Sequence, residues 1–260
     1  MIMPVLFVGH GNPMNAISEN EFVGGFRTVA KALPRPRAIL CISAHWETAG
    51  TMVTAMRHPR TIHDFGGFPP ELYKVQYPAQ GSPQLADEIS SLVTGTDIGS
   101  DLQWGLDHGC WSVVKHLFPA ADIPVVQLSL DYTKPARFHY DLGRELTALR
   151  HSGVLIIGSG NIVHNLGLVD WNNLDTAGFG FDWAMRANTL FRKLIDDRDH
   201  DALINYHLLG NDAALAIPTP EHFLPLLHVI ALQESDDTLS IFNDKPVAGS
   251  LTMTSLHLSR

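Results

Sequence analysis

The sequence has 260 residues, of which 45% are hydrophobic, and it carries a formal net charge of −9. A chain of this length and composition can bury one sizeable core, so we expect a single domain over residues 1–260. The acidic balance, without a cluster of Lys or Arg, argues against a nucleic acid or an anionic membrane surface as the partner. A small neutral or zwitterionic ligand is favoured instead.

In chain order, short runs of Val, Ile and Leu alternate with segments of helical periodicity. Such runs are typical of strands buried on both faces of a mostly parallel sheet. The expected strands span Val5–Val8, Ala38–Ser43, Ile123–Leu130 and Val154–Gly158, with flanking strands over Met52–Met56 and Ser250–His257. The expected helices span Glu21–Lys31, Pro83–Leu92, Trp111–Leu117, Ala136–Leu149, Asp182–Asp196 and His222–Leu232. The alternation predicts an α/β fold with a central, mostly parallel sheet flanked by helices on both faces.

The first apolar segment, Met1–Val8, is too short to cross a bilayer and lacks a basic flank, so we interpret it as a strand. The only two cysteines, Cys41 and Cys110, do not form a CxxC pair. We therefore expect a cytoplasmic protein with reduced thiols, and no sulfur ligand in any metal site. The absence of a coiled coil or a long exposed apolar stretch favours a monomer.

Four histidines follow expected strands or lie near the starts of expected helices: His10, His45, His164 and His222. Ligands bind outside the carboxyl ends of the strands in open α/β sheets. Neutral imidazole is the commonest metal ligand, so these side chains together predict a site for one divalent metal. Because the set is dispersed, unlike an H-E-x-x-H motif, spacing alone leaves open that each is an ordinary core or surface histidine.

Two of these histidines are expected at helix starts. We expect His164 in the first turn of a helix capped by Asn161, where the helix dipole favours neutral imidazole. His222 is expected at the start of the helix that contains Pro225, since proline fits only the first turn. Histidines outside the motifs, such as His139 and His228, are interpreted as surface residues or as hydrogen-bonded core residues.

Two further loops carry histidines. The segment 104–111 contains His108 between two tryptophans, and it either plugs the core or forms an aromatic-walled pocket in which His108 donates to a bound oxygen. The segment 61–69 contains a Gly-Gly-Phe-Pro turn that suits a pocket rim. The segment 158–163 lacks the third glycine of a dinucleotide fingerprint, so no nicotinamide site is expected.

Six motifs in matching order carry a family resemblance. They are Gly9-His10-Gly11-Asn12-Pro13-Met14, Ser43-Ala44-His45-Trp46, Thr61-Ile62-His63-Asp64-Phe65-Gly66-Gly67-Phe68-Pro69, Asp107-His108-Gly109, Ser159-Gly160-Asn161-Ile162-Val163-His164-Asn165 and Pro218-Thr219-Pro220-Glu221-His222. From residue 4 to about residue 257, the chain resembles the class III, LigB-type extradiol ring-cleavage dioxygenases. Within that class it is most similar to the 4,5-DOPA dioxygenase branch.

The resemblance implies a non-haem Fe(II) enzyme that uses O2 to open a catechol ring beside its two hydroxyl carbons. It implies metal binding by His10, His45 and His222, with His164 as a further ligand or as the acid/base and His108 as a pocket histidine. The wider class has a glutamate as third ligand, whereas this chain has His222 with Glu221 beside it. All-imidazole ligation also suits zinc, so we expect Fe(II) for catalysis and Zn(II) as a plausible occupant of purified protein.

Two other functions remain open at the level of the sequence. A zinc-dependent hydrolase could use the same imidazoles to activate water without O2. A non-catalytic binding module is the second alternative, although it would not be expected to keep both His108 and His164. For contacts to the side chain of the catechol, the candidates are Asp64, Tyr73 and Tyr77.

Overall fold

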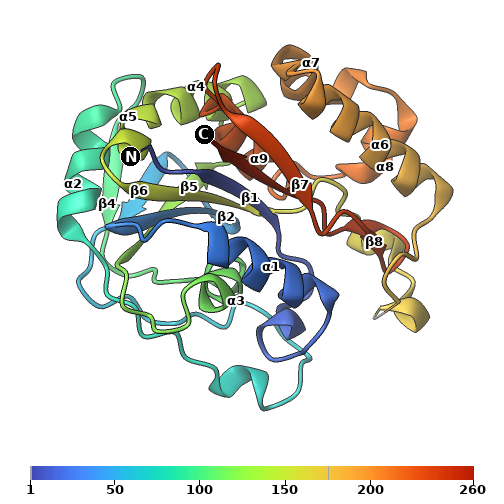
Figure 1. The fold of residues 1–260 in the computed structure, drawn as a ribbon, viewed down its shortest axis with the longest axis horizontal. Coiled ribbons are helices and arrows are strands. Elements are labelled where there is room, and N and C mark those ends of the chain that lie inside the picture. The colour runs from blue at the N-terminus through green and yellow to red at the C-terminus, as the bar shows by residue number, and fades with distance from the viewer. Residues whose placement is uncertain (1, 175) are drawn as a thin grey trace.

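The computed structural model describes residues 2–174 and 176–260. Within these residues, eight strands form one sheet in the order β4-β3-β5-β2-β6-β1-β10-β7 (Figure 1). The strands are β1 (Val5–Gly9), β2 (Ala38–Thr48), β3 (Thr51–Thr54), β4 (Ile98–Asp101), β5 (Val125–Asp131), β6 (Val154–Gly160), β7 (Thr238–Phe242) and β10 (Ser255–Ser259), beside the small pair β8 (Pro246–Val247) and β9 (Leu251–Thr252). The central strands β5, β2, β6 and β1 run parallel, while β10 pairs antiparallel with β1.

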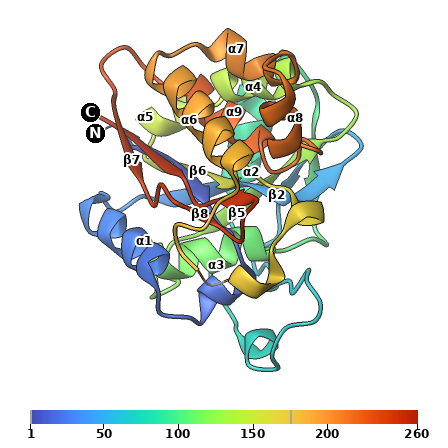
Figure 2. The ribbon, with the colours of Figure 1, turned by 90° about the vertical axis from the view of Figure 1, so that its right-hand side faces the viewer.

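Helices cover both faces of this sheet. One face is covered by α1 (Glu21–Ala32) and α3 (His108–Leu117), and the other carries the remaining helices (Figures 1 and 2). These are α2 (Pro83–Leu92), α4 (Ala136–Glu145), α5 (Thr147–His151), α6 (Asp182–Asp196), α7 (His200–Ile204), α8 (Asn211–Ala216) and α9 (Leu224–Ala231). The expected mostly parallel α/β fold with helices on both faces is therefore confirmed.

Successive residues of the central strands enter two different cores. Val5 and Phe7 pack under α4–α9, whereas Leu6 and Val8 pack under α1 and α3, and all four are fully buried. This alternation follows from the period of two of a β-strand. It explains why these strands are uninterrupted apolar runs in the sequence.

Several elements differ from their expected bounds. The expected helix Ala136–Leu149 is divided at Leu146, whose ψ of −1° interrupts the regular helix and separates α4 from α5. The strand expected over Ala38–Ser43 continues to Thr48, and the one expected over Val154–Gly158 continues to Gly160. The edge strands β4 and β7 and the short helices α7 and α8 were not expected, because their sequences lack a buried apolar run.

No helix in the described part of the chain combines the length and the apolar character needed to span a membrane.

A buried pair of histidines lies where α4 packs on α9. His139 and His228 are fully buried, with ring centroids 5.3 Å apart, and the backbone at His228 approaches α4 closely at Gly143. Among the described residues, both ring nitrogens of His139 and the Nε2 atom of His228 lack a hydrogen-bond partner. Nδ1 of His228 donates to the carbonyl of Leu224 at 3.1 Å, so the expectation of a hydrogen-bonded core residue is confirmed for His228 and is wrong for His139. Burial lowers the pKa of His139 to about 4 and of His228 to about 3.

We expect this pair to make the fold sensitive to acid. An unfolded histidine titrates near pH 6.5, so between about pH 6.5 and pH 4 the unfolded chain binds protons that the folded chain does not. Stability that is present above this window is lost as the pH falls through it, by about 1.4 kcal/mol per pH unit for each histidine. Urea titrations at pH 6.5 and 4.5 measure how the free energy of unfolding depends on pH. For His139→Leu this dependence should be less steep than for the parent chain by about 1.4 kcal/mol per pH unit. The matched control, His58→Leu at an exposed position, should keep the slope of the parent chain, and a His139→Leu slope equal to the parent's would contradict the assignment.

Candidate metal centre

Three histidines meet at the carboxyl edge of the central strands. His10 follows β1 directly, and β1 and β6 are paired up to Gly9 and Gly160. His45 lies in β2 where its pairing with β5 jumps from Ile42–Leu128 to Glu47–Leu130, so the intervening residues form a bulge. His45 therefore lies inside a strand, whereas the sequence predicted that it would follow one.

His222 reaches the same point from the segment before α9. The backbone N–H of Asn161 donates to the carbonyl of His222 at 3.0 Å. A side chain at Gly160 could not be accommodated, because its Cβ would lie 2.1 Å from that carbonyl oxygen. The helix expected from His222 begins two residues later, at Leu224, with Pro225 still in its first turn.

The nitrogens of these three side chains converge. One ligand atom from each of His10, His45 and His222 lies within 4.8 Å of the other two, and the Nε2 atoms of His10 and His45 are 3.1 Å apart. Bonds of about 2.0–2.1 Å from imidazole nitrogen to zinc are compatible with one ion between nitrogens at this separation. His10 and His222 are almost fully buried, and the His45 side chain retains 21% of its exposure.

Hydrogen bonds select the tautomer of His10. The Ser159 hydroxyl donates to the carbonyl of Gly109 at 2.6 Å, and Ser159 Oγ lies 3.0 Å from Nδ1 of His10. Because the single hydroxyl hydrogen is used on Gly109, Nδ1 of His10 is the donor in the second contact. The lone pair of His10 is therefore at Nε2, the nitrogen that faces His45.

His222 is oriented in the same way by its neighbour. Its Nδ1 lies 3.1 Å from Oε1 of Glu221, which also accepts from the hydroxyl of Thr219. A carboxylate can only accept, so Nδ1 of His222 carries the hydrogen and Nε2 carries the lone pair. This arrangement, in which a ligand histidine donates its other N–H to a carboxylate, is common in metal sites.

Burial keeps these imidazoles uncharged. Burial lowers the pKa of His10 and His222 well below the ordinary value, and the neighbouring imidazoles lower both further. Burial, together with His108, lowers the pKa of His45 to about 3 despite the opposing effect of the Asp64 carboxylate. The cluster therefore presents lone pairs at neutral pH and resists protons, which is what a metal ligand set requires.

His108 and His164 each contact a different member of this cluster. His108 begins α3, and its ring centroid lies 3.9 Å from that of His45. Gly109 permits this approach, because a Cβ there would lie 2.5 Å from Ser43 Oγ. His164 is stacked on His222, with centroids 3.4 Å apart and an angle of 8° between the rings. Among the described residues, the possible ligand group that includes His164 is formed with Glu221 and His222.

The helix expected around His164 is absent from this part of the described structure. The side chain of Asn161 donates to the carbonyl of Thr252 and accepts from the N–H of Gly11, so it joins two loops and caps no helix. The N–H of His164 donates to the carbonyl of Ala216. The helix-dipole argument for a neutral His164 is therefore wrong, and burial is what lowers its pKa, to about 4.

The three candidates for contact with a substrate side chain differ in burial and in hydrogen bonding. Tyr77 is buried and its hydroxyl donates to the carbonyl of Phe118, so that expectation is wrong. Asp64 is likewise engaged, because its two carboxylate oxygens accept from the backbone N–H and Nδ1 of His108. Tyr73 is 38% exposed and lies against Phe65, so it remains a candidate.

The two tryptophans around His108 pack as structural groups. Trp111 is fully buried and its Nε1 donates to the carbonyl of Ile62, which matches the alternative in which this loop plugs the core. Trp104 stacks on Trp46, with ring centroids 5.6 Å apart.

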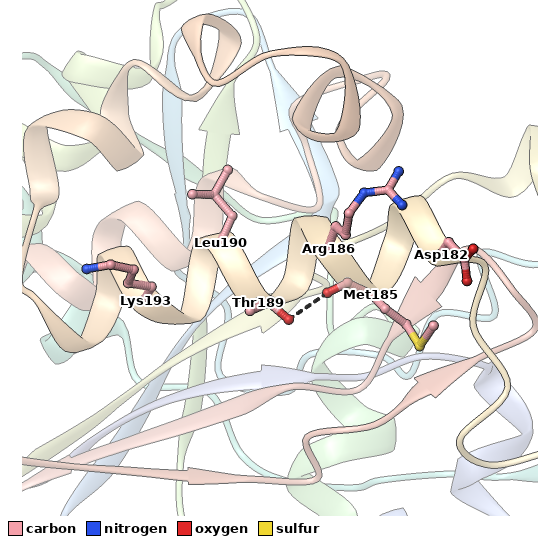
Figure 3. A pocket seen from close by; sticks show the side chains of 6 residues that line it. All are labelled: Asp182, Met185, Arg186, Thr189, Leu190 and Lys193. Atoms are coloured by element: carbon pink, nitrogen blue, oxygen red, sulfur yellow. Dashed lines mark hydrogen bonds between the residues drawn. The ribbon is translucent and has the colours of Figure 1, made fainter.

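A surface hollow of about 460 Å³ lies away from these histidines, along the exposed side of α6 (Figure 3). It is lined by Asp182, Met185, Arg186, Thr189, Leu190 and Lys193. The Thr189 hydroxyl donates to the carbonyl of Met185 within the same helix. All of these lining residues belong to the one helix α6, whereas the histidine cluster gathers side chains from several elements, so we place the candidate chemistry at the histidines.

We expect Ser159→Ala to weaken metal binding without unfolding the protein. His10 loses the acceptor of its Nδ1 hydrogen, and such losses typically weaken metal affinity by about 10- to 100-fold. Zn(II) titration against a chromophoric chelator measures this change. Ser129→Ala is the matched control, since Ser129 is buried in the same sheet and contacts Thr48 and Met52. Equal affinities of the two variants would show that the serine does not support His10.

Comparison with known proteins agrees with this geometry. Residues 4–243 match the family model described as the catalytic LigB subunit of aromatic ring-opening dioxygenase. A 4,5-DOPA dioxygenase extradiol of Escherichia coli (strain K12) is 43% identical, over 98% of this chain and 94% of the relative. A protein of the same name from Beta vulgaris is 37% identical, over 86% and 85% of the two chains.

A solved structure shares the whole fold. The crystal structure of an uncharacterized protein from Escherichia coli K12 has a TM-score of 0.83 and 38% identity, and the match covers 99% of this chain and 100% of that one. The family match over most of the chain and the similarity to these relatives show that the protein belongs to the LigB family of aromatic ring-opening dioxygenases.

Proposed function

We propose that the protein is an Fe(II)-dependent extradiol dioxygenase that opens the ring of a small substituted catechol, such as DOPA, to a semialdehyde. The observation that carries the proposal is the convergence of His10, His45 and His222, with hydrogen bonds that leave Nε2 of His10 and His222 free. Catechol and O2 are the substrates, consistent with the names of the family and of the relatives.

The ligand set fits a divalent cation. Three uncharged imidazoles leave the full charge of the ion in the site, and the Glu221 carboxylate balances part of that charge through its hydrogen bond to His222. In the wider class a glutamate ligand carries negative charge. In this chain the corresponding charge is on Glu221, the residue next to His222. When bound, Fe(II) supplies Lewis acidity that lowers the pKa of the catechol hydroxyls and the redox chemistry that O2 requires.

His164 is our candidate acid/base. It is stacked on His222, so it lies beside the ligand set, and its possible ligand group does not include His10 or His45. Burial keeps the ring uncharged at neutral pH and able to accept a catechol proton. The protonated imidazole of His164 then returns the proton as the catechol ring opens.

The wall near His108 suits a flat substrate. The ring of Phe65 meets His108 edge-on, with centroids 5.5 Å apart, and Tyr73 packs on Phe65. Aromatic walls with few polar groups bind planar apolar bodies and exclude water. This character favours a catechol over the substrates of a zinc hydrolase.

The experiment that tests the function is oxygen uptake. Protein loaded anaerobically with Fe(II) is mixed with air-saturated buffer and a panel of catechols, and a yellow ring-opened product is followed by absorbance. Uptake that depends on both Fe(II) and the catechol is expected, and Zn(II)-loaded protein should show none. Absence of uptake with every catechol would overturn the proposal, and hydrolysis by the Zn(II) form would then favour the hydrolase.

The functional unit that we propose is a cytoplasmic monomer. All five histidines of the site come from one chain, so no partner copy is needed to complete it. Cys41 and Cys110 are both buried free thiols, as a reducing compartment allows.

A further inference from the structure

We infer that Asp64 is a positioning residue that fixes the tautomer of His108, so that Nε2 of His108 can accept a hydrogen bond from a catechol hydroxyl. The inference rests on the proposed function, because the acceptor serves the substrate of that reaction. It replaces the expectation from the sequence that Asp64 contacts the side chain of the catechol, and it differs from the alternative in which His108 donates to a bound oxygen.

The contact between Asp64 and His108 has two points. Oδ1 of Asp64 accepts from the backbone N–H of His108 at 2.8 Å, and Oδ2 lies 2.8 Å from Nδ1 of the same residue. A carboxylate has no hydrogen to give, so Nδ1 must carry the hydrogen. A neutral imidazole has one N–H, which leaves the lone pair of His108 at Nε2.

Asp64 is held in place on both sides. Before it, Thr61 and Leu106 form a β-bridge, and Trp111 donates to the carbonyl of Ile62. After it in sequence, the loop is covered by contacts of Phe65 with its aromatic neighbours. The side chain of Asp64 is only 17% exposed, so the carboxylate is presented to His108 by a rigid loop.

The carboxylate is ionised at neutral pH. Burial alone would raise the pKa of Asp64, but the hydrogen bonds and charge of His108 outweigh burial and lower it below the ordinary value. The hydrogen bond to Asp64 therefore leaves Nε2 of His108 as an acceptor that can orient a catechol hydroxyl, while His164 stays the candidate acid/base.

The contact of Asp64 with the metal ligands is weaker. Oδ2 lies 3.6 Å from Nδ1 of His45, which is too long for a hydrogen bond. His108 itself packs on His45 and lies beside His10, with ring centroids 5.7 Å apart. Asp64 therefore acts on the reaction through His108, and its loss should spare the bound metal.

Asp64→Asn is the decisive variant. The backbone N–H of His108 always donates, so the amide oxygen must face it and the amide NH2 must face Nδ1. Nδ1 then becomes an acceptor, and the hydrogen of His108 moves to Nε2. We expect 15N NMR of Zn(II)-loaded protein to show the Nδ1–H tautomer of His108 in the parent chain and the Nε2–H tautomer in Asp64→Asn.

The kinetics of the Fe(II) form should follow the tautomer. We expect kcat of Asp64→Asn to fall by about 100-fold, because a catechol hydroxyl that has lost its acceptor is held in the wrong orientation, with metal content nearly unchanged. Asp64→Glu restores a carboxylate and should recover the Nδ1–H tautomer and part of the turnover. The double variant Asp64→Asn/His108→Ala should be no slower than His108→Ala, because Asp64 acts only through His108.

Three results would overturn the inference. They are an unchanged tautomer in Asp64→Asn, a loss of metal that parallels the loss of activity, and a double variant slower than His108→Ala by the full factor of Asp64→Asn. Failure of the proposed function looks different: the parent chain would not cleave any catechol, while the NMR spectra would still report whether Asp64 sets the tautomer.

Discussion

His10→Ala is expected to lose tight metal binding and ring cleavage together. His10 supplies one of three converging nitrogens, is almost fully buried, and places its Nε2 3.1 Å from that of His45. Losing a residue that merely hydrogen-bonds a ligand costs about 10- to 100-fold in metal affinity, so losing the ligand should cost more. Elemental analysis after dialysis against buffer with a weak chelator measures the loss directly.

The control for this variant is His58→Ala. His58 is exposed on a loop and contacts none of the site histidines, so metal content and oxygen uptake should equal those of the parent chain. Circular dichroism establishes that both variants are folded. A folded His10→Ala protein that still binds one equivalent of Fe(II) with unchanged affinity would remove His10 from the ligand set.

His164→Ala should keep its metal and lose most of its turnover. Removing a positioned acid/base typically slows a reaction by about 100- to 10,000-fold. The stacked ring of His164 also supports His222, so His164→Gln, which keeps more of the side chain, accompanies the alanine variant. The measurement is kcat per bound Fe(II), which separates slow chemistry from an empty site.

The two His164 variants also decide between the roles that the resemblance leaves open. If His164 is an acid/base, both variants bind one equivalent of Fe(II) and both are slow. Loss of metal from both variants would identify His164 as a further ligand, and unchanged kcat would remove it from the reaction.

The sheet and the meeting of the histidines could be predicted from the sequence because both follow from short-range patterns. The apolar runs around Val5–Val8 and Val154–Gly158 are too short for a typical helix and are uninterrupted, as strands covered on both faces are. Parallel strands end at one edge of the sheet, so histidines that follow them are brought together whatever their distance in the sequence. Six helices with clear apolar periodicity were found for the same reason, and two of them, α2 and α6, have the expected bounds.

The remaining features depend on contacts between distant segments. The bulge that places His45 arises from the pairing of β2 with β5, and the loop that holds His164 is fixed by Ala216 and Leu251. The hydrogen bonds of Ser159 and Asp64 to site histidines likewise join separate parts of the chain. Hydrogen-bond partners of this kind leave no periodic pattern in the sequence, although Ser159 and Asp64 both lie within the motifs that carry the family resemblance.

The position of β1 in the sheet has a consequence for biosynthesis. Its neighbours in the sheet are β6 and β10, and the backbone N–H of Gly9 donates to Oγ of Ser255, 246 residues further along the chain. Contacts of such long range make folding slow, and they leave the edge of β1 unpaired until β10 is available. A nascent chain on the ribosome therefore cannot complete its sheet before β10 has been synthesised, and truncation before residue 255 should produce aggregation-prone protein.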